Sequence, residues 1–143
     1  MAEPVYDLTI TNGTLATHET SEAVNIGITD GCFAALGEVD ADQGREHIDA
    51  TGLTILPGVI DTQVHFREPG IEQKEDLQSG SLAAVMGGVT GVFEMPNTKP
   101  PTTTAEAIED KVARATNRMH CDFAFYVGGT HENAEQLPEL EKM

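Results

Sequence analysis

Two hydrophobic patterns follow one another along the chain, and the change between them comes near Pro57. Before it, short runs alternate apolar and polar residues and end at turn-forming pairs, as Tyr6–Ile10 does before Asn12-Gly13. Alternation with a period of two, closed by an Asn-Gly turn, is typical of β-hairpins. The pattern therefore predicts a small β-sandwich domain over residues 1–56.

From residue 57 to residue 143, apolar strands alternate with helical segments. Strands are predicted at 59–66, 89–95 and 123–127, and helices at 75–87 and from Thr103 onward. Thr103 and Glu106 have the spacing of a capping box. Strands that alternate with helices form parallel sheets, because a parallel pair needs a crossover connection. The second part is therefore expected to be α/β with three βα units, an arrangement that fits an open sheet as well as a barrel.

Composition narrows the classes of function. The 143 residues include 24 acidic and 8 basic side chains, which give a formal net charge of −16. Nucleic acids and anionic membrane surfaces need clustered Lys and Arg, so neither is an expected partner. No apolar run approaches the about 20 residues of a membrane helix, and no signal peptide is recognised. Cys32 and Cys121 form no CxxC pattern, so a cytoplasmic protein without a disulfide framework is expected.

The segment Asp61–Gly70 carries most of the candidate chemistry. Alternate residues of a strand share a face, so Asp61, Gln63 and His65 are expected to project together, with Arg67 just beyond them. Polar side chains on one face of a buried strand need partners. The carboxyl ends of parallel strands are also where α/β enzymes place their sites. Taken alone, His65 fits a histidine satisfied within the core equally well, and it is the grouping that indicates a site.

Several short motifs in this order resemble the dihydroorotase family of the amidohydrolase superfamily. They are Leu56–Asp61, His65–Gly70, Lys74–Asp76, Gly87–Thr90 and Met95–Thr98. The β domain before them is also similar to that of the family, so the resemblance covers essentially the whole chain. It implies a metal-dependent hydrolase with a TIM-type (β/α)8 barrel, which needs about 250 residues. The resemblance therefore implies the N-terminal portion of the enzyme, with the first three βα units of an incomplete barrel, expected to be inactive by itself.

The resemblance also implies a metal site. In the family, one or two metal ions, usually zinc, hold a hydroxide and polarise the amide carbonyl of the ring. The first barrel strand supplies two histidines as His-x-His; the second matches His65, whereas Gln63 stands at the first position. A glutamine carbonyl is a weaker zinc ligand than an imidazole, so Gln63 is a departure from the family pattern. The further ligands and the general base of the family come from later strands, so no catalytic residue is expected within this chain.

Two further residues match substrate contacts of the family. Arg67 matches the arginine that binds the substrate carboxylate, and Asn97 matches a second contact. A guanidinium pairs with a carboxylate through two parallel hydrogen bonds, and dihydroorotate and carbamoyl-aspartate both carry a carboxylate. The alternatives are a surface salt bridge of Arg67 with Glu68 or Glu72, and a turn role for Asn97 after Pro96. Arg67 also favours dihydroorotases over allantoinases and hydantoinases, which resemble this stretch less well.

The expected function is that of a dihydroorotase, the reversible hydrolysis of the cyclic amide of (S)-dihydroorotate to N-carbamoyl-L-aspartate in pyrimidine biosynthesis. Gln63 keeps a second hypothesis open, in which the chain is an inactive dihydroorotase-like subunit that holds an aspartate carbamoyltransferase assembly together. A related cyclic amidase, such as an allantoinase, is a third. The expected partners are the small-molecule substrate, the remainder of the barrel and, as for many relatives, a second copy of the protein in a homodimer.

Overall fold

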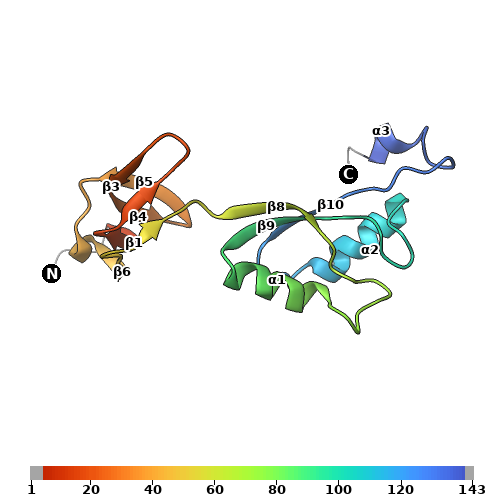
Figure 1. The fold of residues 1–143 in the computed structure, drawn as a ribbon, viewed down its shortest axis with the longest axis horizontal. Helices are drawn as coiled ribbons and strands as arrows, with labels where there is room; N and C mark the ends of the chain where they lie inside the picture. Colours follow the sequence, from red (N-terminus) through yellow and green to blue (C-terminus); the bar gives the residue numbers. More distant parts are fainter. Residues whose placement is uncertain (1–4, 141–143) are drawn as a thin grey trace. The chain divides into compact units, whose positions relative to one another are not determined.

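The computed structural model describes residues 5–140 and divides the chain into two compact units, Met1–Pro57 and Gly58–Met143. The first unit is built of strands and one 3-10 turn, and the second of strands and helices (Figure 1). Within the described residues, no helix has the length and apolar character needed to cross a membrane.

Two small sheets make up the first unit. A four-stranded sheet has the order β5-β4-β1-β6, and a three-stranded sheet has the order β3-β2-β7. The elements are β1 Tyr6–Thr11, β2 Thr14–Ala16, β3 Ser21–Ala23, β4 Asn25–Thr29, β5 Cys32–Gly37, the 3-10 turn Ala41–Gln43, β6 Gly44–Asp49 and β7 Thr54–Ile55. Neighbouring strands are antiparallel except for the pairs β1 with β6 and β2 with β7. An all-β first unit agrees with the alternating pattern of this part of the sequence.

The turn after β1 shows how the local sequence determines the path of the chain in this unit. Asn12 has a φ of 63°, a left-handed conformation that asparagine tolerates. Its side-chain nitrogen donates a hydrogen bond to Asp49 Oδ1 at 2.9 Å, and its backbone nitrogen donates to Asn25 Oδ1 at 3.0 Å. The Asn-Gly pair therefore turns the chain as predicted, and its hydrogen bonds also reach the ends of β4 and β6.

Three parallel strands and three helices form the second unit within the described residues. The elements are β8 Val59–Val64, α1 Leu77–Met86, β9 Val89–Glu94, α2 Ala105–Ala115, β10 Asp122–Phe125 and α3 Leu137–Leu140. The central strand is β9, and both of its pairings are parallel. The predicted succession of βα units around a parallel sheet is confirmed.

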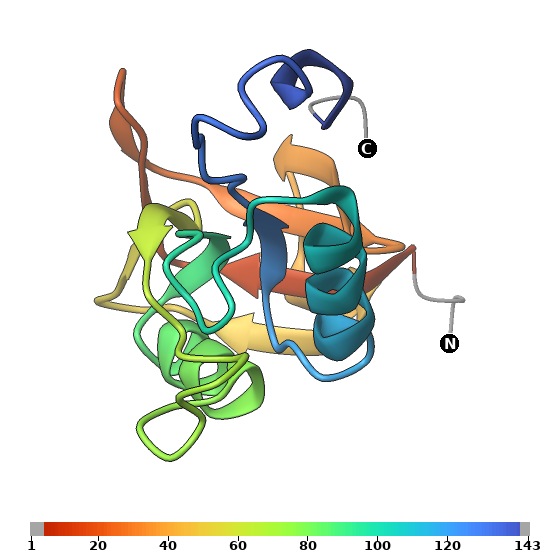
Figure 2. The ribbon, with the colours of Figure 1, turned by 90° about the vertical axis from the view of Figure 1, so that its right-hand side faces the viewer.

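Helices α1 and α2 lie on the same side of this sheet (Figure 1), and α2 runs beside β10 (Figure 2). The buried centre of the core beneath them consists of Phe66, Leu77, Val92 and Ala115. Asp76 begins α1, because its side chain accepts a hydrogen bond from Ser79 N at 2.7 Å. Removal of these apolar side chains from water is the main force that holds the helices on the sheet.

The start of α2 differs from the prediction by one residue. The N-cap is Thr104, whose Oγ1 accepts a hydrogen bond from Ala107 N at 3.2 Å, so the predicted cap at Thr103 is wrong. The physical reason is a tertiary contact: the Thr103 carbonyl accepts a hydrogen bond from the side chain of Asn133 at 2.7 Å and belongs to the preceding loop.

The first strand of the sheet was predicted to be buried, and in the described residues it is mostly exposed. The exposed fractions are 52% for Val59 and 60% for Ile60. The reason is that β8 is an edge strand of the described sheet and pairs with β9 alone, so side chains on both of its faces, such as those of the adjacent Val59 and Ile60, remain in contact with water.

Candidate functional site

The parallel strands of the second unit end at one edge, where a hollow of about 520 Å³ opens. It is lined by the strand ends and the loops that follow, namely Thr62, Gln63, Met95, Pro96, Tyr126, Val127, Gly128 and Gly129. The Tyr126 ring packs edge-on against Phe93, with ring centroids 5.9 Å apart and an interplanar angle of 70°. The hollow therefore has a polar side at Thr62 and Gln63 and an aromatic wall, which suits a small ring with polar substituents.

His65 and Asn97 meet at the same edge, although 32 positions separate them. His65 Nδ1 and Asn97 Oδ1 are 2.8 Å apart. Met95 N donates to Val64 O at 3.0 Å and joins the backbones just before these two residues. Because an amide oxygen only accepts, Nδ1 is the donor, and in the neutral ring Nε2 then carries the lone pair. This is the tautomer of a histidine that binds a metal through one nitrogen while a neighbour orients the other.

Asp61 and Gln63 lie on the same strand but take no part in this contact. Asp61 Oδ1 accepts a hydrogen bond from Gln63 N at 3.0 Å, where the register of β8 is irregular. The Gln63 carboxamide makes no hydrogen bond to the described residues and lines the hollow. Among residues 5–140, no three His, Cys, Asp or Glu side chains are placed to hold a metal ion. His65 and Gln63 therefore offer one nitrogen and one oxygen donor at this edge, and the described residues add no complete ligand set to them.

Arg67 and its neighbour Glu68 have different environments. Glu68 is buried, and Arg118 donates two hydrogen bonds to it, at 2.8 Å to Oε1 and 3.0 Å to Oε2. Leu77 N donates a third at 3.1 Å. The hydrogen bonds from Arg118 hold the pKa of Glu68 below its usual value, against the effect of burial. Arg67 is half-buried, and its side chain makes no hydrogen bond or ion pair with any described residue.

This pairing removes one alternative for Arg67. A salt bridge between Arg67 and Glu68 was one alternative interpretation of the sequence, but Arg118 occupies that carboxylate. Glu72, the other candidate, accepts a hydrogen bond from Gly70 N at 2.9 Å. The guanidinium of Arg67 remains available to an anion from outside these residues.

The loops after β8 and β9 are locked together. Lys99 N donates a hydrogen bond to Pro69 O at 3.0 Å. Gly70 has a φ of 94°, and a Cβ at this position would overlap the Lys99 carbonyl oxygen. The loop that carries Arg67 and the loop that carries Asn97 therefore hold each other in place.

A buried ion pair lies just before the second loop. Lys111 Nζ donates to Glu94 Oε2 at 2.9 Å, and both side chains are 1% exposed. Glu94 Oε1 has no hydrogen-bond partner among the described residues. Lys111 Nζ also lies 5.3 Å from the centroid of the Phe125 ring. Sequence reasoning missed this pair, since a charged residue inside a strand needs a partner but the local pattern does not identify Lys111 as the partner of Glu94.

The pH dependence of stability is expected to reveal Glu94. Burial raises its pKa to about 7 from 4.5, although Lys111 acts in the opposite direction. Between these pH values, the folded state holds a proton that the unfolded state has released, so stability falls as pH rises. The free energy of unfolding of the protein minus that of Glu94→Gln is expected to fall by about 2–3 kcal/mol from pH 4.5 to 7.5, measured by denaturant titration.

The matched control is Glu68→Gln. Because the pKa of Glu68 is lowered, its stabilisation is present above the usual carboxyl pKa and is lost as pH falls below it, which is the opposite slope. The free energy of unfolding of the protein minus that of Glu94→Gln could instead stay flat or rise between pH 4.5 and 7.5. That result would show that Glu94 is ionised in the folded protein throughout this range.

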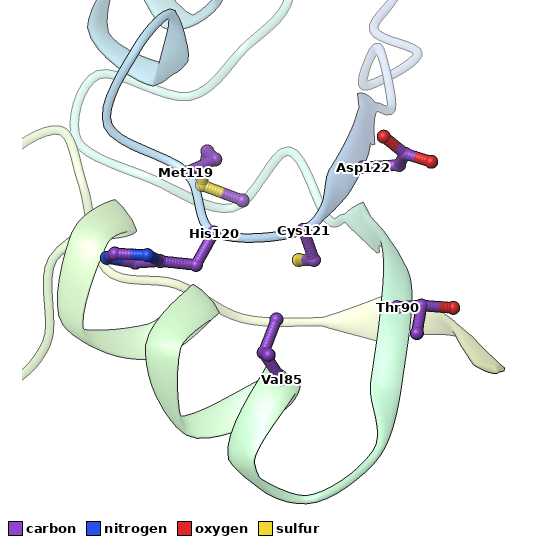
Figure 3. Close-up of a pocket in the computed structure, with 6 residues that line it drawn as sticks. All are labelled: Val85, Thr90, Met119, His120, Cys121 and Asp122. Atoms are coloured by element: carbon purple, nitrogen blue, oxygen red, sulfur yellow. The ribbon is translucent and has the colours of Figure 1, made fainter. Parts of the chain in front are cut away.

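A second hollow, of about 410 Å³, lies near the amino ends of β9 and β10 and is a weaker candidate. Figure 3 shows its lining residues, Val85, Thr90, Met119, His120, Cys121 and Asp122. Burial raises the pKa of the Cys121 thiol, which disfavours the reactive thiolate. This end of the strands holds none of the predicted site residues.

A family model and individual relatives place this chain in the same family. Residues 52–141 match the family described as dihydro-orotase-like. An allantoinase from Rubrobacter xylanophilus is 40% identical over 136 residues, which cover 94% of this chain and 30% of the relative. A dihydroorotase from Methanothermobacter thermautotrophicus is 44% identical over 107 residues, which cover 73% of this chain and 24% of the relative.

Solved structures agree with this family at the level of the fold. The L-hydantoinase (dihydropyrimidinase) of Arthrobacter aurescens superposes with a TM-score of 0.87 at 32% identity, covering 96% of this chain and 31% of that chain. The chain thus spans between 24% and 31% of the length of these three relatives. Similarity over the whole chain does not separate allantoinases from dihydroorotases.

Proposed function

The chain belongs to the dihydro-orotase-like family, and on this basis we propose that the protein containing it hydrolyses a cyclic amide, with dihydroorotate as the substrate. In this reaction the oxygen of water bonds to the ring carbonyl carbon, the ring C–N bond breaks, and a proton passes to the nitrogen. The product is carbamoyl-aspartate, and the reaction is reversible.

The observation that carries the choice of substrate is the environment of Arg67. A half-buried guanidinium without an anionic partner, in a chain with a net charge of −16, is suited to a carboxylate from outside. Dihydroorotate carries a carboxylate on its ring, whereas the rings of allantoin and hydantoin do not. Arg67 would hold this carboxylate bidentately, and the lock between the two loops would keep Asn97 in place at the same edge.

A metal ion fits the donors at this edge in part. His65 would bind it through Nε2 while Asn97 orients the ring through Nδ1, and Gln63 would add a neutral oxygen. Such an ion supplies an activated water and polarises the amide carbonyl. The proposal requires further ligands from outside residues 5–140, since the described residues hold no complete set. The barrel of the amidohydrolase superfamily, which would bring such ligands to this edge, is part of the proposal.

Gln63 favours one competing function. A dihydroorotase-like subunit without a metal would have no need of an imidazole at this position, and it would act as a structural partner, for example of an aspartate carbamoyltransferase. Arg67 opposes this alternative, because a half-buried cation without a partner costs stability and brings a structural subunit no benefit.

The test is hydrolysis by the intact protein that contains this sequence, with residues 1–143 alone as a second sample. Dihydroorotate, allantoin and hydantoin are supplied in parallel, with zinc and then with a chelator. Chelator-sensitive turnover of dihydroorotate by the intact protein, and none by residues 1–143, is expected. Preference for allantoin or hydantoin would overturn the substrate, and no turnover of any ring by folded intact protein would favour the structural subunit.

A further inference from the structure

The wall of the hollow that faces Gln63 is formed by the segment after β10, and the sheet holds only its beginning. Tyr126 N donates to Glu94 O at 2.9 Å, and this is the last ladder contact of the segment. The next residues, Val127, Gly128 and Gly129, line the hollow without belonging to a strand. Their position must therefore be set by other contacts.

Asn133 supplies one of these contacts, and two more to neighbouring loop residues, through one buried side chain. Its Nδ2 donates to Gly128 O at 2.8 Å and to Thr103 O at 2.7 Å. Its Oδ1 accepts from Thr130 N at 2.7 Å. Both amide hydrogens and the oxygen are thus used at short distances, and the residue is 5% exposed. One carboxamide joins the loop after β9 to two points of the loop after β10.

The two loops touch where Asn133 joins them. A Cβ placed on Gly128 would lie 3.3 Å from Thr103 Cγ2 and 3.4 Å from Pro96 Cβ, closer than most side-chain contacts. Gly128 N also donates to Thr102 O at 2.8 Å. Gly128, which belongs to this wall, therefore packs closely against Pro96. Pro96 precedes Asn97, the residue that orients His65.

We propose that Asn133 is a positioning residue that fixes the wall opposite Gln63 and thereby sets the width of the hollow and the tightness with which it holds a small ring. Asn133 lies outside the lining of the hollow, so it acts through Gly128 and Thr130 and not by contact with the ligand. The effect of Asn133 on catalysis rests on the proposed hydrolysis. Loss of its side chain is expected to raise KM for that reaction with kcat little changed, because a loosened wall weakens ground-state and transition-state binding alike.

The experiment uses the isotopically labelled intact protein and measures hydrogen exchange by NMR. In the unmodified protein, both side-chain amide hydrogens of Asn133 and the backbone amides of Gly128 and Thr130 are expected to be protected. In Asn133→Ala, exchange at Gly128 and Thr130 is expected to be at least about tenfold faster. In Asn133→Asp, which keeps an acceptor for Thr130 and removes both donors, Gly128 is expected to lose more protection than Thr130.

The matched control is Leu77→Ala, which removes core packing without touching either loop. It is expected to speed exchange in α1 more than at Gly128 and Thr130. Unprotected Asn133 side-chain hydrogens in the unmodified protein would overturn the proposal even where Asn133→Ala does not fold. Equal effects of Asn133→Ala and Leu77→Ala on the two loop amides would also overturn it.

Enzyme kinetics separate this proposal from the proposed function. For Asn133→Ala, KM for dihydroorotate is expected to rise by roughly tenfold, with kcat within about twofold. A fall in kcat with KM unchanged would overturn the positioning role. If the intact protein hydrolyses none of the rings tested, the proposed function fails, and the exchange measurements still decide whether Asn133 fixes the wall.

Discussion

Replacement of Arg67 by methionine is expected to lower kcat/KM for dihydroorotate by roughly 30- to 1,000-fold, which corresponds to about 2–4 kcal/mol of lost binding energy. The reason is that Arg118 and the Gly70 amide already bind the nearby carboxylates of Glu68 and Glu72, and that the proposed role of Arg67 is to neutralise the substrate carboxylate. Methionine keeps the length and most of the packing of the side chain while removing the charge and the forked donors. The measurement is steady-state hydrolysis by the intact protein.

Two controls make the Arg67 result specific. Lys74→Met removes an exposed cation on the same loop and is expected to change kcat/KM by no more than about twofold. A ring without a carboxylate, such as hydantoin, is expected to be hydrolysed at the same rate by the unmodified protein and by Arg67→Met. If Arg67→Met retains kcat/KM for dihydroorotate within a factor of about three, Arg67 does not bind the carboxylate.

Replacement of Lys111 by methionine is expected to reduce the free energy of unfolding by about 3–5 kcal/mol at pH 8, because it leaves the Glu94 carboxylate buried without a counter-charge. Glu94 already has one oxygen without a hydrogen-bond partner among the described residues, so the loss of Lys111 would leave the whole group unsatisfied. The measurement is chemical denaturation. Acidification to pH 4 is expected to reduce the difference, since Glu94 is then neutral in both states.

The double variant Glu94→Gln/Lys111→Met tests this cause, and most of the lost stability is expected to return in it. Asp110→Asn is the control on the same helix: it breaks the exposed pair of Asp110 with Arg114, 2.7 Å apart, and is expected to cost no more than about 1 kcal/mol. Equal losses for Lys111→Met and Asp110→Asn would mean that the buried pair contributes no more than an exposed one.

The sequence was sufficient for the elements that depend on local pattern. The parallel strands and the turn at Asn12 follow from periodicity and turn chemistry, and both are present in the structure. His65 and Asn97 were assigned to the site from the ends of predicted strands and from resemblance. The structure brings these two residues into contact.

Contacts between distant segments could not be predicted in the same way. Glu68 and Arg118 are 50 positions apart, and nothing in the local pattern says which of the basic residues reaches a given carboxylate. Lys111 lies in a helix where a lysine is ordinarily solvated, and only the packing of α2 on the sheet shows that it is buried. Nothing in the local pattern around Asn133 shows that its side chain joins two loops.

The close approach of Gly70 to Lys99 bears on how this scaffold can be altered. A segment transplanted after β8 that carries any residue other than glycine at position 70 would place a Cβ against the Lys99 carbonyl oxygen, unless the segment after β9 changes with it. The segments after β8 and β9 should therefore be exchangeable only as a matched pair. Substrate range in such chimeras would then change in a single step when both segments are grafted together, and single grafts would fold poorly.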